Sequence, residues 1–291
     1  MKSSTIAIAA ALLLAAALPA CSLAQNAPAH KFTVYQFIPY REHVAGSELA
    51  KVPALKDYME SVGIHPIDVV YDNRYLTNGQ PDEKKIVEVA TTALHHPKIP
   101  VSFDTEFGDR FHPETVIPNV TQILSIYHRI NTVTPVGVYA TAPQNTYAWK
   151  PDISRFDALN AQYATIAQQV DYLSPVLYNY EGADTAAWQR AAVYNMAAAK
   201  KYGTGKPILS YIGIIIRLQS SGKDDSSQHG AVRMLTESEM LARLQTLYNL
   251  GADGCIVWAS SSDRTLDGKM PYFDRNSGWG KALADFAAAH K

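Results

Sequence analysis

Short apolar runs rich in β-branched residues recur along this chain and alternate with amphipathic segments. Each run is continuously apolar, which is typical of a strand buried on both faces. The runs cover residues 32–38, 67–71, 99–103, 136–140, 172–178, 208–212 and 255–258. Most of them begin about 35 residues apart, which is the spacing of β-α units with right-handed crossovers. The pattern therefore predicts an α/β fold with a parallel sheet.

Segments with helical periodicity lie between the apolar runs. They cover residues 84–94, 116–130, 153–169, 186–201 and 237–250. The last segment is preceded by Thr236 and carries Glu239 three residues later, which predicts a capping box at its start. Seven or eight β-α units close a barrel, so we predict a TIM-like (β/α) barrel of about seven or eight parallel strands, distorted, in a single domain over residues 31–291. The polar stretch 219–231 follows the sixth run and predicts a mobile loop over the mouth of the barrel.

The N-terminal residues have the pattern of a secretory signal. Lys2 precedes an almost unbroken apolar run from Ile6 to Leu18, and small residues follow. The run is short for a bilayer span, which needs about 20 residues. We expect a signal peptide over residues 1–24 with a linker over 25–30, or a signal of residues 1–20 if Cys21 is the lipidated first residue of a lipoprotein. Either route predicts an exported protein, which is periplasmic, an outer-membrane lipoprotein or extracellular.

Charge and cysteine content narrow the function classes. The formal net charge of −1 shows no basic excess of the kind that neutralises phosphates, so we expect no nucleic-acid partner. Contact with a membrane is expected only through an N-terminal lipid. Cys21 and Cys255 are the two cysteines of the chain, which predicts a mature fold without an internal disulfide. No pair of histidines has metal-ligand spacing, and we expect neither a metal nor another cofactor.

Two carboxylates one residue apart follow the third apolar run. Asp104 and Glu106 end the stretch 101–106, and side chains two apart on a strand point to the same face. At the C-terminal end of a barrel strand, both would enter the place where such folds hold their active sites. The pair suggests acid and base chemistry on a glycosidic bond. A D-x-E on its own also fits two solvated residues at the start of a loop.

Aromatic and acidic side chains also follow the other predicted strands. They are Tyr40, Asp72, Tyr139, Tyr178, Tyr180, Tyr211 and Trp258. Flat aromatic faces stack on sugar rings, and carboxyl groups protonate glycosidic oxygens. Each aromatic alone also fits a core position, since barrel strands are built from bulky residues. Their shared place at the strand ends indicates a site that binds a glycan.

The order and spacing of these segments resemble the hyaluronidase-like glycoside hydrolases of animals and venoms. The resemblance lies in residues 32–39, 71–72, 101–106, 136–139, 143–147, 173–178 and 251–260. It implies a distorted seven-stranded (β/α) barrel and a hydrolase acting on a glycan that contains N-acetylhexosamine. It also implies a role for each residue of the D-x-E. Glu106 would be the general acid and base, and Asp104 would orient the N-acetyl group of the substrate.

The same resemblance implies a retaining, substrate-assisted mechanism. The acetamido oxygen of the sugar would attack the anomeric carbon in place of an enzyme nucleophile, and Tyr178, Tyr211 and Trp258 would line the acetamido pocket. Thr105 stands where the animal enzymes have tryptophan, Phe37 stands where they have a polar residue, and their disulfides are missing. These departures leave the acid in place and leave the substrate open among N-acetylhexosamine glycans, cell-wall and exopolysaccharide material included.

Two alternatives remain open from the residues. One is a glycosidase with two catalytic carboxylates, in which Glu106 pairs with Asp72 or Glu181 and the separation sets the stereochemistry. The other is a carbohydrate-binding barrel without activity, because one fold hosts both functions.

Overall fold

The computed structural model describes residues 30–42, 52–147, 153–218 and 230–291. The expected signal segment, Cys21 and all of the linker except His30 lie outside the described residues. Most of the predicted loop over 219–231 does so too. Within the described part, no helix has the length and apolar character that crossing a bilayer requires.

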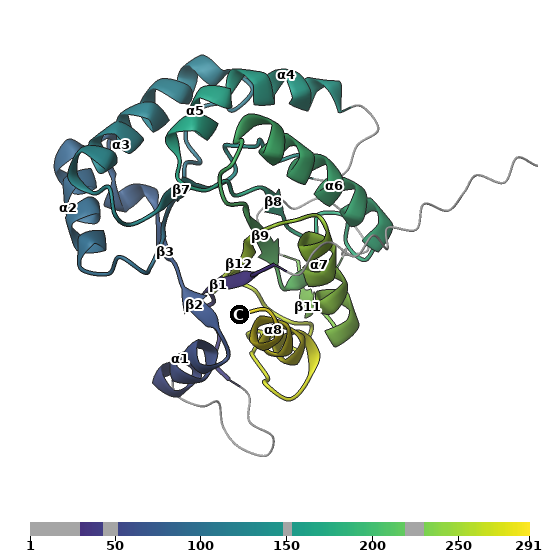
Figure 1. The fold of residues 1–291 in the computed structure, drawn as a ribbon. Coiled ribbons are helices and arrows are strands. Elements are labelled where there is room, and N and C mark those ends of the chain that lie inside the picture. The colour runs from purple at the N-terminus through teal and green to yellow at the C-terminus, as the bar shows by residue number, and fades with distance from the viewer. Residues whose placement is uncertain (1–29, 43–51, 148–152, 219–229) are drawn as a thin grey trace, which may run out of the picture.

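Parallel strands form two sheets that meet along one stretch of chain. The strand order is β2-β1-β12-β9-β8 in the first sheet and β3-β6-β7 in the second. The strands are β1 (Thr33–Phe37), β2 (Ile64–Pro66), β3 (Asp68–Val70), β6 (Val101–Phe103), β7 (Val136–Val138), β8 (Val176–Leu177), β9 (Leu209–Gly213) and β12 (Gly254–Trp258). Ile67 alone separates β2 from β3, so this stretch pairs with β1 through its first half and with β6 through its second. The strands curve around a common centre (Figure 1).

The seam between β7 and β8 differs from the other strand boundaries. No strand ladder joins β7 to β8 within the described ranges. The amide of Asp171 donates to Val136 O at 2.8 Å, the carboxylate of Asp171 accepts from the amide of Val136 at 2.8 Å, and Ser174 Oγ donates to Val138 O at 2.8 Å. A Cβ on Gly137 would lie 2.5 Å from the ring of Tyr172, so glycine lets this ring pack against β7. The parallel α/β sheet agrees with the prediction, whereas a complete barrel ladder is interrupted here.

Helices lie outside the strands (Figure 1). They are α1 (Val52–Ser61), α2 (Glu83–Leu94), α3 (Ile117–Ile130), α4 (Ser154–Gln162), α5 (Ala164–Gln169), α6 (Thr185–Tyr202), α7 (Glu237–Asn249) and α8 (Gly278–Ala289). The predicted capping box is confirmed, because Thr236 Oγ1 accepts from the Glu239 amide and Glu239 accepts from the Thr236 amide. The helix predicted over 153–169 is two helices, since the chain turns at the buried Tyr163, whose hydroxyl donates to Arg110 O at 3.0 Å.

Short local elements complete the fold. They are the antiparallel pairs β4 (Leu76–Thr77) with β5 (Gln80–Pro81) and β10 (Ile215–Arg217) with β11 (Val232–Met234), and the 3₁₀ turns η1 (Asp72–Arg74) and η2 (Pro113–Thr115). The segment 219–229, which lies outside the described residues, connects β10 to β11 in the sequence.

Side chains fill the space that the strands enclose. A buried cluster there contains Ile67, Val69, Tyr172, Val176, Leu209, Tyr211 and Ile256. Two of its tyrosines reach β6, because Tyr172 donates to Val101 O and Tyr211 donates to Ser102 Oγ, each at 2.8 Å. The enclosed space is therefore a packed core, as in TIM barrels, and not a channel.

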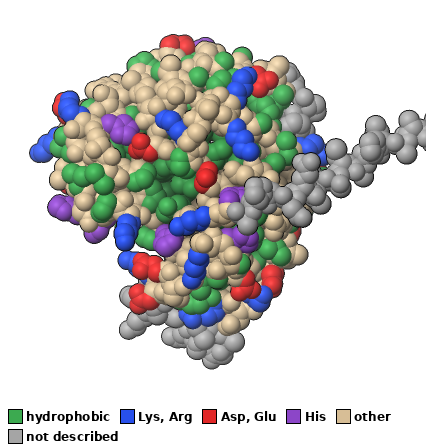
Figure 2. Space-filling model, in the orientation of Figure 1, with side chains coloured by type: hydrophobic (Ala, Val, Ile, Leu, Met, Phe, Trp, Pro, Cys, Tyr) green, Lys and Arg blue, Asp and Glu red, His purple; other side chains and the backbone are tan. Residues whose placement is uncertain are grey.

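The surface and the second cysteine agree with a neutral, core-stabilised protein. Lysine and arginine side chains are scattered among acidic ones on the face seen in Figure 2. Cys255 is fully buried, and this burial raises the pKa of its thiol well above the ordinary value. A buried thiol of this kind packs as a small apolar side chain.

Candidate active site

Backbone pairing on both sides holds the D-x-E segment at the end of β6. The amide of Asp104 donates to Val70 O at 2.9 Å, and the amide of Tyr139 donates to Phe103 O at 2.8 Å. Thr105, between the two acids, is 6% exposed and its hydroxyl lies 2.6 Å from the hydroxyl of Thr141. The side chain of Thr105 thus anchors the segment, while the acids on either side of it share the opposite face.

The two acids meet an aromatic pocket at the C-terminal ends of the strands. Its volume is about 70 Å³. The residues that line this aromatic pocket are Val69, Asp104, Glu106, Tyr139, Tyr178, Tyr211 and Trp258. They come from within β3 and β9 or from the ends of β6, β7, β8 and β12. Parallel strands that end at one edge bring together residues that are far apart in the sequence.

Ring contacts and hydrogen bonds fix the walls of the aromatic pocket. The rings of Tyr178 and Trp258 stack with centroids 5.7 Å apart, and Tyr139 meets Tyr211 edge-on at 5.1 Å. Trp258 Nε1 donates to the hydroxyl of Tyr71 at 3.1 Å. Rings held at these distances form preset faces for the apolar side of a sugar.

Burial raises the pKa of both carboxyl groups. Burial, the charge of Glu106 and the charge of Asp72 together raise the pKa of Asp104 to about 7. Burial also raises the pKa of Glu106. Among the described residues, no lysine or arginine lines the aromatic pocket, and Asp104 Oδ1 is buried without a hydrogen-bond partner. The site thus holds a proton near neutral pH and offers a buried acceptor to an incoming donor.

Three residues predicted for the site, Tyr40, Asp72 and Tyr180, do not line the aromatic pocket. Tyr40 is 1% exposed and donates to the carboxylate of Asp263 at 3.1 Å, so it packs in the core. This placement corrects the prediction, because the chain turns inward after β1 before it reaches Tyr40. Asp72 is exposed in η1 and accepts from the amide of Asn73 at 2.7 Å. Asp72 acts on Asp104 through its charge, which helps to raise the pKa of Asp104.

Tyr180 lies at the rim. Its side chain is 40% exposed, its hydroxyl accepts from Asn145 Nδ2 at 3.1 Å, and its ring centroid lies 5.9 Å from that of Tyr178. Glu181, which the two-carboxylate alternative invokes, does not line the aromatic pocket.

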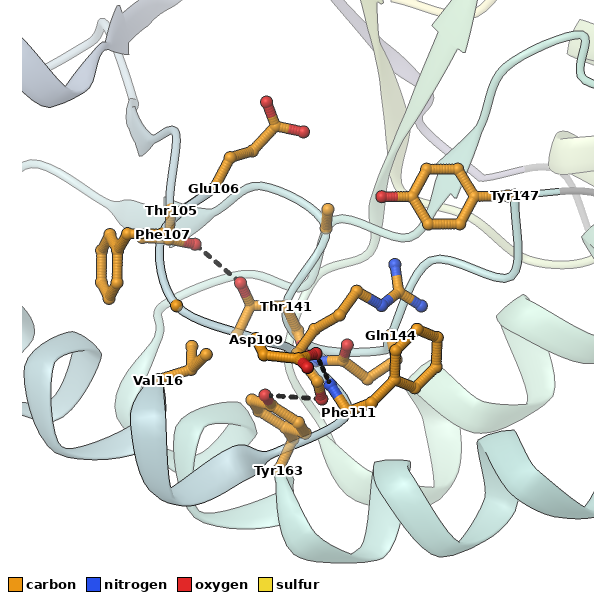
Figure 3. A pocket seen from close by; sticks show the side chains of 13 residues that line it. Thr105, Glu106, Phe107, Asp109, Phe111, Val116, Thr141, Gln144, Tyr147 and Tyr163 are labelled. Carbon is orange, nitrogen blue, oxygen red and sulfur yellow. Dashed lines mark hydrogen bonds between the residues drawn. The ribbon is translucent and has the colours of Figure 1, made fainter.

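A second pocket, which we call the arginine pocket, opens beside the first. Its volume is about 310 Å³, and its lining includes Glu106, Arg110, Gln144, Tyr147 and Tyr163 (Figure 3). No sequence pattern singles out Arg110, which lies in the loop after β6. Gln144 and Tyr147 belong to the stretch 143–147, which carries part of the family resemblance but no predicted site residue.

In the part of the chain that the structure describes, no group of three or more His, Cys, Asp or Glu side chains is placed to hold a metal ion.

Comparison with known proteins places the fold. No protein-family model matches the sequence, and no curated protein matches it significantly. Among solved structures, bee venom hyaluronidase in complex with a hyaluronic acid tetramer is 15% identical, with a TM-score of 0.54 over 80% of this chain and 92% of that chain. An endo-beta-1,4-mannanase from Thermotoga petrophila is 14% identical, with a TM-score of 0.52 over 88% of this chain and 70% of that chain.

A third solved structure has another activity in its name. The β-D-glucuronidase of Dictyoglomus thermophilum is 15% identical, with a TM-score of 0.52 over 90% of this chain and 51% of that chain. At such identities the likeness is one of fold. The chain has the α/β fold of TIM-barrel glycoside hydrolases, and the likeness does not single out the hyaluronidases among them.

Proposed function

We propose that this protein is a glycoside hydrolase that cleaves a glycan containing N-acetylhexosamine, with retention of configuration and with assistance from the substrate. The observation that carries the proposal is the meeting of Asp104 and Glu106 in one aromatic pocket, where Asp104 Oδ1 is a buried acceptor without a partner. An acetamido N–H supplies the donor that this oxygen lacks. The glycosidase fold supports the assignment by analogy.

Glu106 acts as general acid in the proposed first step. Its proton goes to the glycosidic oxygen as the bond from that oxygen to the anomeric carbon breaks. The acetamido carbonyl oxygen forms a bond to the anomeric carbon from the opposite face, which gives a cyclic oxazolinium. Asp104 accepts a hydrogen bond from the acetamido nitrogen, holds the group in place and stabilises the positive charge that develops there.

Glu106 acts as general base in the second step. Its carboxylate takes a proton from a water molecule as the water oxygen attacks the anomeric carbon. The oxazolinium ring opens as its bond to the anomeric carbon breaks, and the acetamido group is restored. Glu106 is protonated again for the next turnover. Two inversions at one carbon give net retention.

The shape of the aromatic pocket supports this scheme. A volume of about 70 Å³ suits a substituent of a few heavy atoms better than a whole sugar ring. Tyr211, whose hydroxyl is bound to Ser102, and the stacked pair of Tyr178 and Trp258 give this substituent apolar walls.

The alternatives have less support. Neither Asp72 nor Glu181 lines the aromatic pocket or the arginine pocket, and a two-carboxylate mechanism needs its second carboxylate beside the scissile bond. A raised carboxyl pKa costs folding stability at neutral pH. Proton transfer gives that cost a function.

A glycan screen tests the proposal. The mature protein is incubated with hyaluronan, chondroitin, chitooligosaccharides and peptidoglycan fragments, with mannan as a substrate that lacks N-acetyl groups, and new reducing ends are counted. We expect cleavage of an N-acetylhexosamine glycan, an initial product with retained anomeric configuration by NMR, and inhibition by a thiazoline analogue of the cyclic intermediate. Cleavage of mannan alone, or binding without cleavage of any glycan, would contradict the proposal.

A further inference from the structure

The arginine pocket and the aromatic pocket meet at one side chain. Among the described residues, Glu106 is the one that lines both. Figure 3 shows Glu106 and Tyr147 at one end of the arginine pocket, while Phe111, Gln144 and Tyr163 lie at the other end. A ligand that passes Glu106 can therefore occupy both pockets at once.

The position of Asp104 fixes the order of the two pockets along a substrate. Asp104 lines the aromatic pocket and does not line the arginine pocket. In the proposed mechanism, Asp104 contacts the sugar that carries the attacked anomeric carbon, and Glu106 contacts the oxygen that leaves. The arginine pocket, which contains the acid without the orienting group, thus lies on the side of the leaving group.

Two polar side chains in the arginine pocket each have one group bound and one group unused. A terminal guanidinium nitrogen of Arg110 donates to Asn145 O, while Arg110 Nε is buried with no partner in the described residues. Gln144 Nε2 donates to Thr141 O at 2.6 Å, while Gln144 Oε1 is likewise buried without a described partner. One unused donor and one unused acceptor match the hydroxyl groups of a sugar, which both accept and donate.

Aromatic rings connect the two pockets along one wall. The ring of Tyr180 lies 5.9 Å from that of Tyr178 in the aromatic pocket and 5.4 Å from that of Tyr147 in the arginine pocket. Tyr147 is 46% exposed, and the guanidinium carbon of Arg110 lies 4.8 Å from its ring centroid. An exposed ring supported by a cation is a platform on which a sugar face can stack.

We propose that the arginine pocket is a leaving-group subsite, which binds the hydroxyl-bearing sugar on the reducing side of the scissile bond. Arg110 and Gln144 contact its hydroxyl groups, and Tyr147 stacks on its face. The inference rests on the proposed function and adds to it a preference for bonds within an oligosaccharide over simple glycosides. Arg110 and Tyr147 then determine specificity at the reducing side.

Two substrates with the same glycon test this subsite. One is an oligosaccharide that the enzyme cleaves, and the other is the 4-methylumbelliferyl glycoside of its glycon half; for a chitin-type substrate these are chitotetraose and 4-methylumbelliferyl chitobioside. We expect Tyr147→Ala and Arg110→Met to lower kcat/KM for the oligosaccharide about tenfold more than for the aryl glycoside, since each removes a stacking face or a charged hydrogen bond. Product analysis should show that the sugar on the leaving side raises kcat/KM in the wild type.

Arg155→Met is the matched control. The guanidinium carbon of Arg155 lies 3.6 Å from the ring centroid of Phe111, and that of Arg110 lies 5.1 Å from it. Arg155 does not line the arginine pocket. We expect Arg155→Met to have the wild-type kcat/KM for both substrates. Equal losses on both substrates for Tyr147→Ala, in a protein whose thermal unfolding matches the wild type, would overturn the subsite and leave the proposed function standing. A wild type that cleaves neither substrate class would overturn both.

Discussion

The aromatic pocket is built on strand ends, whereas the arginine pocket is built on loops. In the first, Asp104 continues the pairing of β6 with β3, and the hydroxyl of Tyr211 is bound to Ser102 in the packed core. In the second, Arg110 and Tyr147 lie several residues beyond the strands that precede them. Side chains on strand ends are held most rigidly, which suits bond breaking, and loops allow a choice of partner. The difference predicts that changes in the first pocket reduce kcat and changes in the second reduce selectivity.

The largest expected effect is that of Glu106→Gln. This change keeps the shape of the side chain and removes its transferable proton, so kcat should fall by about 10² to 10⁴. Substrate binding should change little. Steady-state kinetics on the cleaved glycan measure both. Glu114→Gln is the control, because Glu114 is a nearby exposed acid that lines neither pocket. If Glu106→Gln turned over substrate at the wild-type rate, Glu106 would not be the general acid, and the catalytic role assigned to the aromatic pocket would fail.

A smaller loss of kcat is expected for Asp104→Asn. The amide still fills the space but no longer accepts and polarises as a carboxylate does, so we expect a loss of about 10² in kcat. Substrates that carry an N-acetyl group at the cleaved bond should show the loss. Selectivity between an oligosaccharide and its aryl glycoside should stay as in the wild type. A variant that changes only this selectivity and keeps the wild-type kcat would contradict the role of Asp104 in bond breaking.

The same substitution should stabilise the protein in a pH-dependent way. The pKa of Asp104 in the folded state is about 7, and that of an aspartate in an unfolded chain is about 4. Between these values the folded state binds more protons than the unfolded state, so the free energy of unfolding of the wild type falls as pH rises. Asp104→Asn lacks this loss. The Tm of the variant should therefore exceed that of the wild type increasingly from about pH 4 to about pH 7, and a constant difference would contradict the raised pKa.

The smallest expected effect concerns Tyr211, which lines the aromatic pocket. Tyr211→Phe keeps the ring and removes the hydroxyl that donates to Ser102 Oγ at 2.8 Å. We expect the free energy of unfolding to fall by about 1 kcal/mol in urea denaturation. In a double-mutant cycle with Ser102→Ala, the loss in the double variant should be smaller than the sum of the two single losses, because both changes remove the Tyr211–Ser102 hydrogen bond. Fully additive losses would show that the hydrogen bond between Tyr211 and Ser102 does not contribute to the free energy of unfolding.

Periodicity was enough to predict what depends on strands. Continuous apolar runs specify strands buried on both faces, parallel strands bring their C-terminal ends to one edge, and the side chains after those ends then meet. Asp104, Glu106, Tyr139, Tyr178 and Trp258 follow this logic. Tyr211 joins them from within β9, and all six line one pocket. Tyr40 does not, because two residues separate it from the end of β1 and its side chain packs in the core.

Loop geometry was beyond the reach of the same reasoning. Arg110 is seven residues from the end of β6, and no hydrophobic period reports the direction in which such a loop folds back. A retrospective signal exists in the stretch 143–147, where Gln144 and Tyr147 stand close together after a strand end. The split of the helix predicted over 153–169 has a similar origin, since the buried Tyr163 takes its place through a tertiary contact with Arg110.

The seam between β7 and β8 has a consequence for engineering this protein. A regular backbone ladder depends little on side-chain identity. This boundary has the backbone hydrogen bond from the Asp171 amide to Val136 O and otherwise depends on which residues stand at positions 137, 171 and 174. Tyr139 and Tyr178 stand directly beyond its two edges. Substitutions at the three seam positions would thus alter the spacing of these two rings while the paired strands elsewhere keep their register. A redesign of the aromatic pocket for a bulkier sugar substituent would begin at this seam.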